Sequence, residues 1–358
     1  MDFELTDDQL ELQRVVREVA EQECPAALVR AVIAGTDDAD ALWKTYVQLD
    51  WPSLVVPEAA GGMGLGTVEL VLVLEELGRV SDPTPFLATT SQYLALVRAC
   101  GDDAQQAALL GAIPAGGTGA AAFDGDVTAS RSGDGWTLRG TARNVVDGDR
   151  ADEVAVVART DDGPGVFVTS RTDVAATRQT TFDDTMHVAD LRLDGVSIGA
   201  DRALLAGGED GIAAGRAAAT TGLAATMVGA SQRAFELALG HIRERKQFGV
   251  PIGSFQALKH MAADVFVAIE RARALCQFAG LAIDEGDPRR LLAASMAKAA
   301  AGDAQRIAAQ HGIQFFGGLG FTWENDLHLY VRRAKVGELL LGTSAEHRVR
   351  VAKEVLAR

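Results

Sequence analysis

The chain has 358 residues, of which 48% are hydrophobic, and it carries a formal net charge of −15. This length can bury a substantial core and predicts two or three domains. The negative charge opposes sequence-independent binding to nucleic acid phosphates or anionic lipid, so we expect protein and small-molecule partners. No stretch approaches the roughly 18 apolar residues of a membrane helix, and the N-terminus is acidic rather than a basic signal region. We therefore expect a cytoplasmic protein.

Cysteine and histidine give no indication of a metal site. Cys24, Cys100 and Cys276 are far apart, are odd in number and lack metal-ligand spacing, so buried thiols are the favoured interpretation. The six histidines show no metal pattern, and none has a local Ser and Asp as a catalytic triad would need. We expect packing or surface roles for these side chains.

The first third of the chain is predicted to be helical. Apolar residues recur at helical spacing from Phe3, Thr6 and Gln9 form a capping box, and Pro25 ends this helix. Three further helices are predicted at Ala41–Leu49, Thr67–Leu77 and Ser91–Leu110. The acidic run at 37–40 is expected to be a solvated loop and helix cap.

The middle of the chain changes to a β pattern. Gly and Asp turns separate short β-branched runs, which are Trp136–Leu138, Val154–Ala158, Val166–Thr169 and Val188–Leu193. Long Ala-rich amphipathic stretches follow at 211–247, 254–285, 288–312, 325–341 and 343–357. The predicted class is α+β, with an N-terminal helical domain (1–112), a small central β-barrel domain (113–205) and a C-terminal four-helix bundle (206–358).

Three C-terminal motifs identify a family. The order and spacing of these motifs agree with the C-terminal signatures of acyl-CoA dehydrogenases: Arg245-Lys246-Gln247-Phe248-Gly249 with Pro251-Ile252-Gly253-Ser254-Phe255-Gln256, then Gln314-Phe315-Phe316-Gly317-Gly318-Leu319-Gly320-Phe321, then Gly342-Thr343-Ser344. The resemblance extends to Val56-Pro57-Glu58, Gly61-Gly62-Met63-Gly64-Leu65 and Glu75-Glu76-Leu77-Gly78, and so covers nearly the whole chain.

The resemblance implies FAD bound across a subunit interface, with the isoalloxazine against one β domain and the ADP end held by the neighbour's bundle. It implies a set of cofactor-binding residues, which are Arg245, Gln247, Phe248, Gln256, Gln314, Gly317, Gly318 and Thr343. Their chemistry agrees with this role. Arg245 offers planar donors suited to a pyrophosphate, the Gln amides can hydrogen-bond, and Gly317-Gly318 allow close backbone approach.

The catalytic base of the family is missing from its usual positions. The family removes the α proton of an acyl-CoA thioester with a Glu, and in many members this Glu precedes the Gly-Thr that corresponds to Gly342-Thr343. Leu341 occupies that position here. Alternative base positions align with Ala219 and Thr226, and neither side chain is a carboxylate. Glu338 lies one turn before Leu341 and could face similarly, although a solvated carboxylate is the favoured interpretation.

The flavin side of the resemblance is also altered. Asn144 and Val146 align where the family usually carries a Trp and a hydroxyl residue. Where the family usually has an acidic and Gly-Ser-Asp loop near the flavin, this chain has Ala120-Ala121-Ala122-Phe123-Asp124-Gly125. This erosion indicates a mixed oligomer, since actinobacterial acyl-CoA dehydrogenases acting on steroid side-chain thioesters pair a catalytic subunit with a base-lacking partner in α2β2 tetramers.

The expected partners are therefore a homologous catalytic subunit, an acyl-CoA substrate and an electron-transfer flavoprotein as acceptor. Two alternatives remain open at this point. The chain could be a scaffold or acyl-CoA-binding paralogue without cofactor, or a self-sufficient homotetramer that uses another base such as Glu338.

Overall fold

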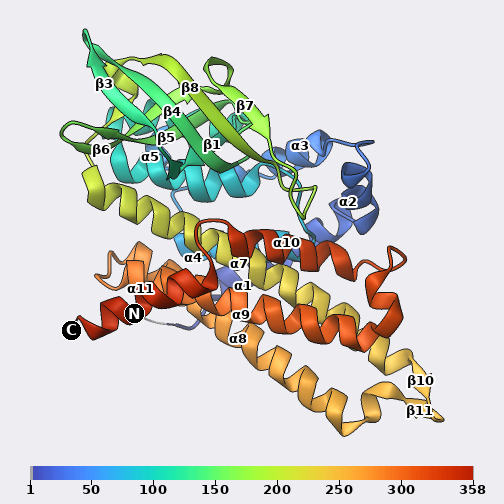
Figure 1. Ribbon diagram of the computed structural model, residues 1–358. Coiled ribbons are helices and arrows are strands. Elements are labelled where there is room, and N and C mark those ends of the chain that lie inside the picture. The colour runs from blue at the N-terminus through green and yellow to red at the C-terminus, as the bar shows by residue number, and fades with distance from the viewer. Residues whose placement is uncertain (1–2, 358) are drawn as a thin grey trace. The chain divides into compact units, whose positions relative to one another are not determined.

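The computed structural model describes residues 3–357, which form two compact units (Figure 1). Residues 3–37, 71–82 and 223–357 form the helical unit. Residues 38–70 and 83–222 form the sheet unit. Each unit is described by itself. Across residues 3–357, no helix combines the length and the apolar character that a membrane crossing requires.

Helices α1 and α3 begin where the sequence predicts them, whereas the intervening α2 was not predicted. Helix α1 (Asp7–Glu23) opens with the predicted capping box, because the Thr6 hydroxyl accepts from the Gln9 amide and the Gln9 side chain accepts from the Thr6 amide. Helix α2 (Ala26–Ile33) starts directly after Pro25. Helix α3 (Asp40–Gln48) follows the acidic run, where the Asp38 side chain accepts from the Asp40 amide.

The prediction of one helix over Ser91–Leu110 is wrong. The segment begins inside a π-helix (Leu87–Tyr93) and then contains α5 (Leu94–Cys100) and α6 (Asp103–Leu110). The break falls where Gly101 takes an extended conformation and Asp102 caps α6, with its side chain accepting from the Gln105 amide at 2.9 Å. A local capping box thus ends an apolar pattern that periodicity alone reads as continuous.

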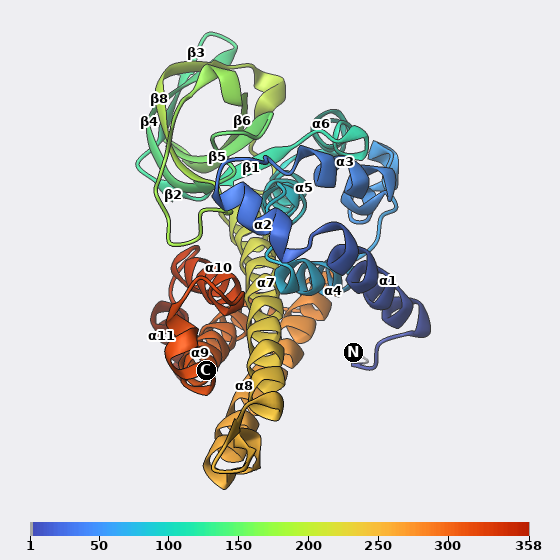
Figure 2. The ribbon, with the colours of Figure 1, turned by 90° about the vertical axis from the view of Figure 1, so that its right-hand side faces the viewer.

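The sheet unit contains one nine-stranded sheet, and each of the four predicted β runs lies inside one of its strands. Its pairing order is β7-β8-β4-β3-β5-β6-β9, with β1 paired to β5 and β2 to β4. Most pairs are antiparallel, whereas β1 and β3 run parallel to β5. Figure 2 shows that the sheet is strongly curled. The strands are β1 (Gly119–Ala122), β2 (Asp124–Gly125), β3 (Thr128–Ser132), β4 (Gly135–Val146), β5 (Glu153–Thr160), β6 (Gly163–Ser170), β7 (Ala175–Arg178), β8 (Val188–Ile198) and β9 (Ala203–Leu204).

Alternating apolar residues of these strands build the core of the sheet unit. Trp136 and Phe167 meet edge to face with ring centroids 5.2 Å apart, and Leu138 and Leu191 are fully buried beside them. The edge strands β2 and β7 are short and largely exposed, as short edge strands usually are.

The predicted C-terminal helices are confirmed to within four residues at each end. They are α7 (Gly208–Glu244), α8 (Gln256–Asp284), α9 (Arg290–Phe316), α10 (Leu327–Leu339) and α11 (Ser344–Leu356). Within the helical unit, α9 packs against α8, α10 and α11. Helix α4 (Thr67–Arg79) packs so closely on α7 that a Cβ at Gly78 would lie 2.2 Å from the Thr226 carbonyl oxygen.

Candidate functional site

A β-hairpin follows the C-terminal end of α7 and carries the first predicted cofactor motif. Strand β10 (Lys246–Gln247) pairs with β11 (Val250–Pro251), and Phe248 and Gly249 form the two-residue turn (Figure 1). Both turn residues have positive φ, 53° and 80°, as in the type I′ turns that suit two-residue hairpins. Phe248 is 93% exposed, and its ring meets that of Phe255 in a T-shaped arrangement with centroids 6.3 Å apart, so most of the ring is presented to solvent.

The start of α8 and the end of α9 lie at the same end of the helical unit as this hairpin. A small apolar cluster of Ala238, Ile242 and Phe315 ties α7 to α9, and Ile252 and Met261 pack against it. The rings of His241 on α7 and Phe316 on α9 stack with centroids 4.5 Å apart. These contacts bring together motifs that lie about seventy residues apart in the chain.

The predicted cofactor residues at this end present their polar groups outward. We call them the distal cluster, which consists of Arg245, Gln247, Phe248, Gln256, Gln314, Gly317 and Gly318. All seven are exposed. Gly317 has φ +62°, and an added Cβ at Gly317 or Gly318 would meet nothing within 4 Å, so a ligand can approach this backbone closely.

The segment that carries the first part of the distal cluster is basic although the chain as a whole is acidic. Residues 241–260 contain the bases Arg243, Arg245, Lys246 and Lys259 and the single acid Glu244. Burial, together with the neighbouring charge of Arg245, lowers the pKa of His241, so this ring is neutral at pH 7. The local positive charge suits an anionic ligand such as a pyrophosphate.

Thr343 lies apart from the distal cluster and has a structural task. It is the N-cap of α11, where its hydroxyl accepts from the Glu346 amide and its own amide donates to the Glu346 carboxylate at 2.7 Å. This capping box satisfies the first turn of α11. The Thr343 backbone and side chain are thus already engaged within the chain.

Leu341 lies in the turn between α10 and α11, three residues before α11 begins. Its φ is +57°, an uncommon conformation for a branched side chain, and Gly342 follows at φ +103°. The Leu341 carbonyl oxygen is 3.1 Å from His347 Nε2. The position at which the family carries its base therefore has a well-defined backbone and an aliphatic side chain.

The interpretation of Glu338 as a solvated carboxylate is wrong. Its side chain is only 13% exposed, because Oε1 accepts from the Ser344 amide at 3.1 Å and from the Ser344 hydroxyl, while Oε2 pairs with Lys335. Burial opposes ionisation, but the bonds from Ser344 and Lys335 outweigh it and lower the pKa of Glu338. Glu338 caps α11 rather than offering a raised-pKa base.

The two other aligned base positions are buried on α7. Ala219 has no exposed surface and no proton acceptor in its side chain. Thr226 is 4% exposed, and its hydroxyl donates to the Leu223 carbonyl at 2.8 Å. Neither side chain can act as a carboxylate base.

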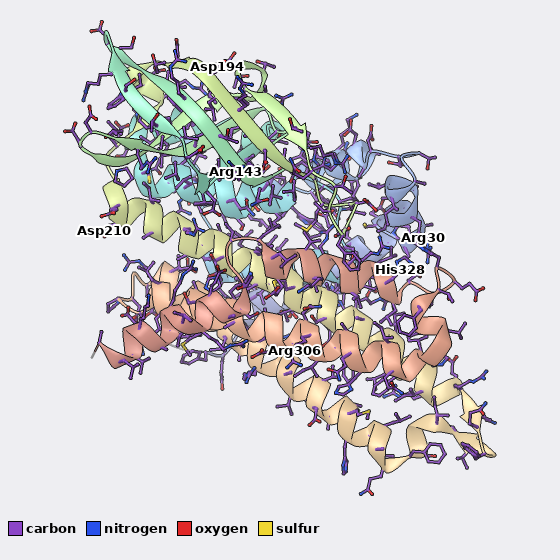
Figure 3. All side chains as sticks on the ribbon, in the orientation of Figure 1. Arg30, Arg143, Asp194, Asp210, Arg306 and His328 are labelled. Atoms are coloured by element: carbon purple, nitrogen blue, oxygen red, sulfur yellow. The ribbon has the colours of Figure 1, made fainter. Side chains whose placement is uncertain are left out.

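The segments aligned with the flavin side of the family lie in the sheet unit. Asn144 is exposed at an irregularity in the β4–β8 pairing, with φ +55° and its amide bonded to Asp190, whereas Val146 is buried. At the neighbouring loop, the Arg216 guanidinium binds the Asp124 carboxylate at 2.9 Å and lies 5.7 Å from the Phe123 ring centroid. Arg143 is exposed on β4 beside Asn144 (Figure 3). Charged side chains thus occupy this region.

Lys298 on α9 was missed by the sequence interpretation. It is fully buried, and its Nζ atom lies 2.7 Å from the Gly342 carbonyl oxygen and 3.1 Å from that of Glu338. The available signal was a lysine in the Ala-rich stripe of a long helix, Ala297-Lys298-Ala299, where a buried small residue is expected. Among residues 3–357, no group of three or more His, Cys, Asp or Glu could hold a metal ion, and the three cysteines are buried.

Comparison with known proteins identifies the family. The family models "Acyl-CoA dehydrogenase, N-terminal domain" and "Acyl-CoA dehydrogenase, C-terminal domain" match residues 6–117 and 214–356. Acyl-CoA dehydrogenase IpdE2 of Mycobacterium tuberculosis is 35% identical over 338 residues, or 94% of this chain and 93% of the relative. The chain belongs to the acyl-CoA dehydrogenase family, whose members are FAD-dependent oxidoreductases. The family resemblance inferred from the motifs is confirmed.

Two solved structures show the same fold over essentially the whole chain. The ChsE4-ChsE5 complex from Mycobacterium tuberculosis superposes with a TM-score of 0.93 at 27% identity, covering 100% of both chains. A variant of the Tcur3481-Tcur3483 steroid acyl-CoA dehydrogenase superposes with a TM-score of 0.89 at 29% identity, covering 98% of both chains. The predicted fold class, with a helical N-terminal domain, a central β-sheet domain and a C-terminal helical domain, is confirmed.

Proposed function

We propose that this chain is the base-lacking subunit of a hetero-oligomeric, FAD-dependent acyl-CoA dehydrogenase, and that it contributes the distal cluster to an FAD shared with a catalytic subunit. The observation that carries the proposal is the state of the donors in that cluster. Within residues 3–357, the side chains of Arg245, Gln247 and Gln256 make no hydrogen bond or ion pair and are exposed. These donors have no partner within the described part of the chain and lie on a basic surface, so they are available to an anionic ligand. The proposal is that a second subunit holds the rest of that ligand.

The residues present fit the ADP part of FAD. Arg245 would bind the pyrophosphate with its planar fork, Gln247, Gln256 and Gln314 would donate or accept through their amides, and Gly317-Gly318 would bring backbone N–H groups close to the ligand. Phe248 would cover an apolar part of the cofactor. When bound, FAD supplies the hydride acceptor for α,β-dehydrogenation of an acyl-CoA thioester.

The lack of a suitable base at the four candidate positions of this chain supports the assignment of chemistry to the partner subunit. Leu341, Ala219 and Thr226 cannot accept a proton, and Glu338 is committed to α11 with a lowered pKa. A base for an α proton needs the opposite environment, an apolar site that raises the pKa of a carboxylate toward neutrality. The α2β2 arrangement and a steroid-derived acyl group are proposed by analogy with the ChsE4-ChsE5 complex and with the steroid acyl-CoA dehydrogenase described above. An electron-transfer flavoprotein is the proposed acceptor.

Purification of the native complex tests this proposal. We expect this chain alone to be colourless and inactive, and the complex with its catalytic partner to be yellow with one FAD for each pair of unlike subunits. A yellow, active homo-oligomer would replace the proposal with a self-sufficient dehydrogenase. A colourless complex that still binds acyl-CoA would assign the chain as a scaffold or binding paralogue.

A further inference from the structure

The turn between α10 and α11 holds a backbone conformation that its sequence disfavours. Leu341 has φ +57°, which costs an L-residue with a Cβ roughly 1–2 kcal/mol relative to right-handed backbone. Surrounding groups must therefore over-determine this conformation. Three of them do so from outside the turn: Lys298 bonds two carbonyls, His347 approaches the Leu341 carbonyl, and Glu338 accepts from Ser344.

Lys298 is unusual for a buried lysine, because both of its hydrogen bonds go to neutral carbonyl groups rather than to a carboxylate. Its Nζ lies 3.1 Å from the Glu338 carbonyl oxygen and 2.7 Å from the Gly342 carbonyl oxygen, which bracket the turn. Within residues 3–357, no carboxylate lies within bonding distance of its Nζ, and the side chain has no exposed surface. A neutral amine has two N–H donors, which match these two carbonyls, whereas an ammonium has a third donor that finds no acceptor here.

We propose that Lys298 is a proton-sensitive lock on the Leu340–Thr343 turn: as a neutral amine it closes the turn through Glu338 and Gly342, and as an ammonium it favours an opened, hydrated turn. The turn itself supplies the carbonyls that cover Nζ, so opening admits water to the charge. The inference concerns this chain alone and does not depend on the proposed function.

The charged surroundings of Lys298 agree with this lock. The groups on α10 and α11 that act on it or on its partners are Lys335, Glu338, Glu346, His347 and Arg350. The attraction of Glu338 and Glu346 is smaller than the effect of burial, which lowers the pKa of Lys298 to about 7. Lys298 therefore changes charge in the closed turn near neutral pH, while a hydrated lysine does so at about 10.4.

The difference in the pKa of Lys298 between the closed and opened turn determines how opening depends on pH. Between pH 7 and about 10, the opened turn binds one more proton than the closed turn, so the opening constant falls tenfold for each pH unit. The amides of Thr343 and Ser344 report opening, because they donate to the carboxylates of Glu346 and Glu338 at 2.7 and 3.1 Å. The intrinsic rate of amide exchange rises about tenfold per pH unit, while the opening constant falls tenfold. The observed exchange rate of these two amides, which is the product of the two, should therefore not change with pH.

The test is hydrogen exchange of the full chain from pH 6 to pH 9, resolved to residues 340–346. We expect exchange at Thr343 and Ser344 to be nearly independent of pH above 7, and Lys298→Met to restore a tenfold acceleration per unit. Lys335→Met removes a lysine on α10 whose side chain is 45% exposed and should keep the wild-type profile. A wild-type profile that accelerates tenfold per unit above pH 7 would overturn the proposal, as would an unchanged profile in Lys298→Met.

A second variant keeps the test decisive if Lys298→Met does not fold. Leu341→Gly relieves the positive φ while leaving both carbonyl acceptors in place, so the turn should exchange more slowly at every pH with the same flat profile above pH 7. A steep profile in this folded variant would equally overturn the proposal.

Discussion

The Nε atom of Arg273 on α8 lies 2.7 Å from the carboxylate of Glu75 on α4, whose side chain is 2% exposed. The pair joins two helices that are distant in the chain. Gln232 on α7 also accepts from Arg273, so three helices of the helical unit meet at one guanidinium. The pair was not visible in the sequence, where Glu75 was noted only as part of a family motif.

Replacing Arg273 by Met should destabilise the fold by about 3–5 kcal/mol, because it leaves the buried Glu75 without its counter-charge. Urea unfolding followed by circular dichroism measures the loss. Arg271→Met is the matched control on α8, since the Arg271 side chain is 55% exposed and its ion pair with Asp303 contributes about 0.5 kcal/mol or less. If the two variants lost the same free energy of unfolding, burial of the Arg273–Glu75 pair would not be the cause of the destabilisation.

The Arg273→Met deficit should also depend on pH. Burial raises the pKa of Glu75 above its unfolded value, and loss of Arg273 raises that pKa further. A raised carboxyl pKa means that the folded state binds protons more readily, so the contribution of Glu75 to stability falls as pH rises through the folded pKa. The deficit should therefore be smaller at acidic pH, where Glu75 is protonated in the folded state, and should grow as pH rises through its raised pKa. A deficit that is constant with pH would contradict this.

Replacing Arg245 by Gln should weaken FAD binding by the assembled complex about tenfold to a hundredfold, which corresponds to the roughly 1.5–3 kcal/mol of one charge-assisted hydrogen bond. Flavin fluorescence on dilution measures the release. Arg243→Gln changes the same charge two residues away and should leave FAD affinity within about twofold. Loss of subunit assembly rather than of FAD would assign Arg245 to the protein interface instead.

Replacing Glu338 by Gln should leave the activity of the complex unchanged and lower stability by about 1 kcal/mol at pH 7, because a charged acceptor at Ser344 becomes a neutral one. The folded pKa of Glu338 is depressed, so its contribution is present above the unfolded pKa and disappears as pH falls through the folded pKa. Denaturation at pH 7 and pH 4 measures this. Glu244→Gln, at an exposed position, is the control. Loss of activity in Glu338→Gln would identify Glu338 as a catalytic base.

Replacing Gly78 by Ala should destabilise the helical unit by about 1–3 kcal/mol, because the new Cβ would lie 2.2 Å from the Thr226 carbonyl oxygen and 2.7 Å from its Cα. Backbone atoms cannot move aside as a flexible side chain can. Gly240→Ala on α7 meets nothing within 4 Å and should instead be neutral or stabilising by up to about 1 kcal/mol. Thermal unfolding of both variants separates the packing effect from helix propensity.

The sequence predicted most of the fold because the responsible signals are local. Apolar periodicity, the Thr6 capping box and Pro25 define the first helix, and alternating runs such as Val154–Ala158 define strands. The same reasoning missed the break at Gly101-Asp102, where a capping box lies inside an apolar pattern. Local sequence signals thus predicted where helices and strands lie better than they predicted where a helix breaks.

The polar interior was beyond prediction because burial of a charge depends on tertiary partners. Lys298 lies within an alanine stripe, but its carbonyl partners come from a turn about forty residues later. Glu338 was interpreted as solvated because its acceptor role toward Ser344 depends on how α10 and α11 meet. Motif order, in contrast, located the distal cluster, since the exposed donors at Arg245, Gln256 and Gln314 lie at one end of the helical unit.

The hairpin turn at Phe248-Gly249 holds an aromatic ring 93% in solvent. No residue of this chain other than Phe255 makes a ring contact with it within the described range. Under the proposed function this ring meets a cofactor or a second subunit, so substitutions in the hairpin would be constrained by that contact rather than by the folding of this chain.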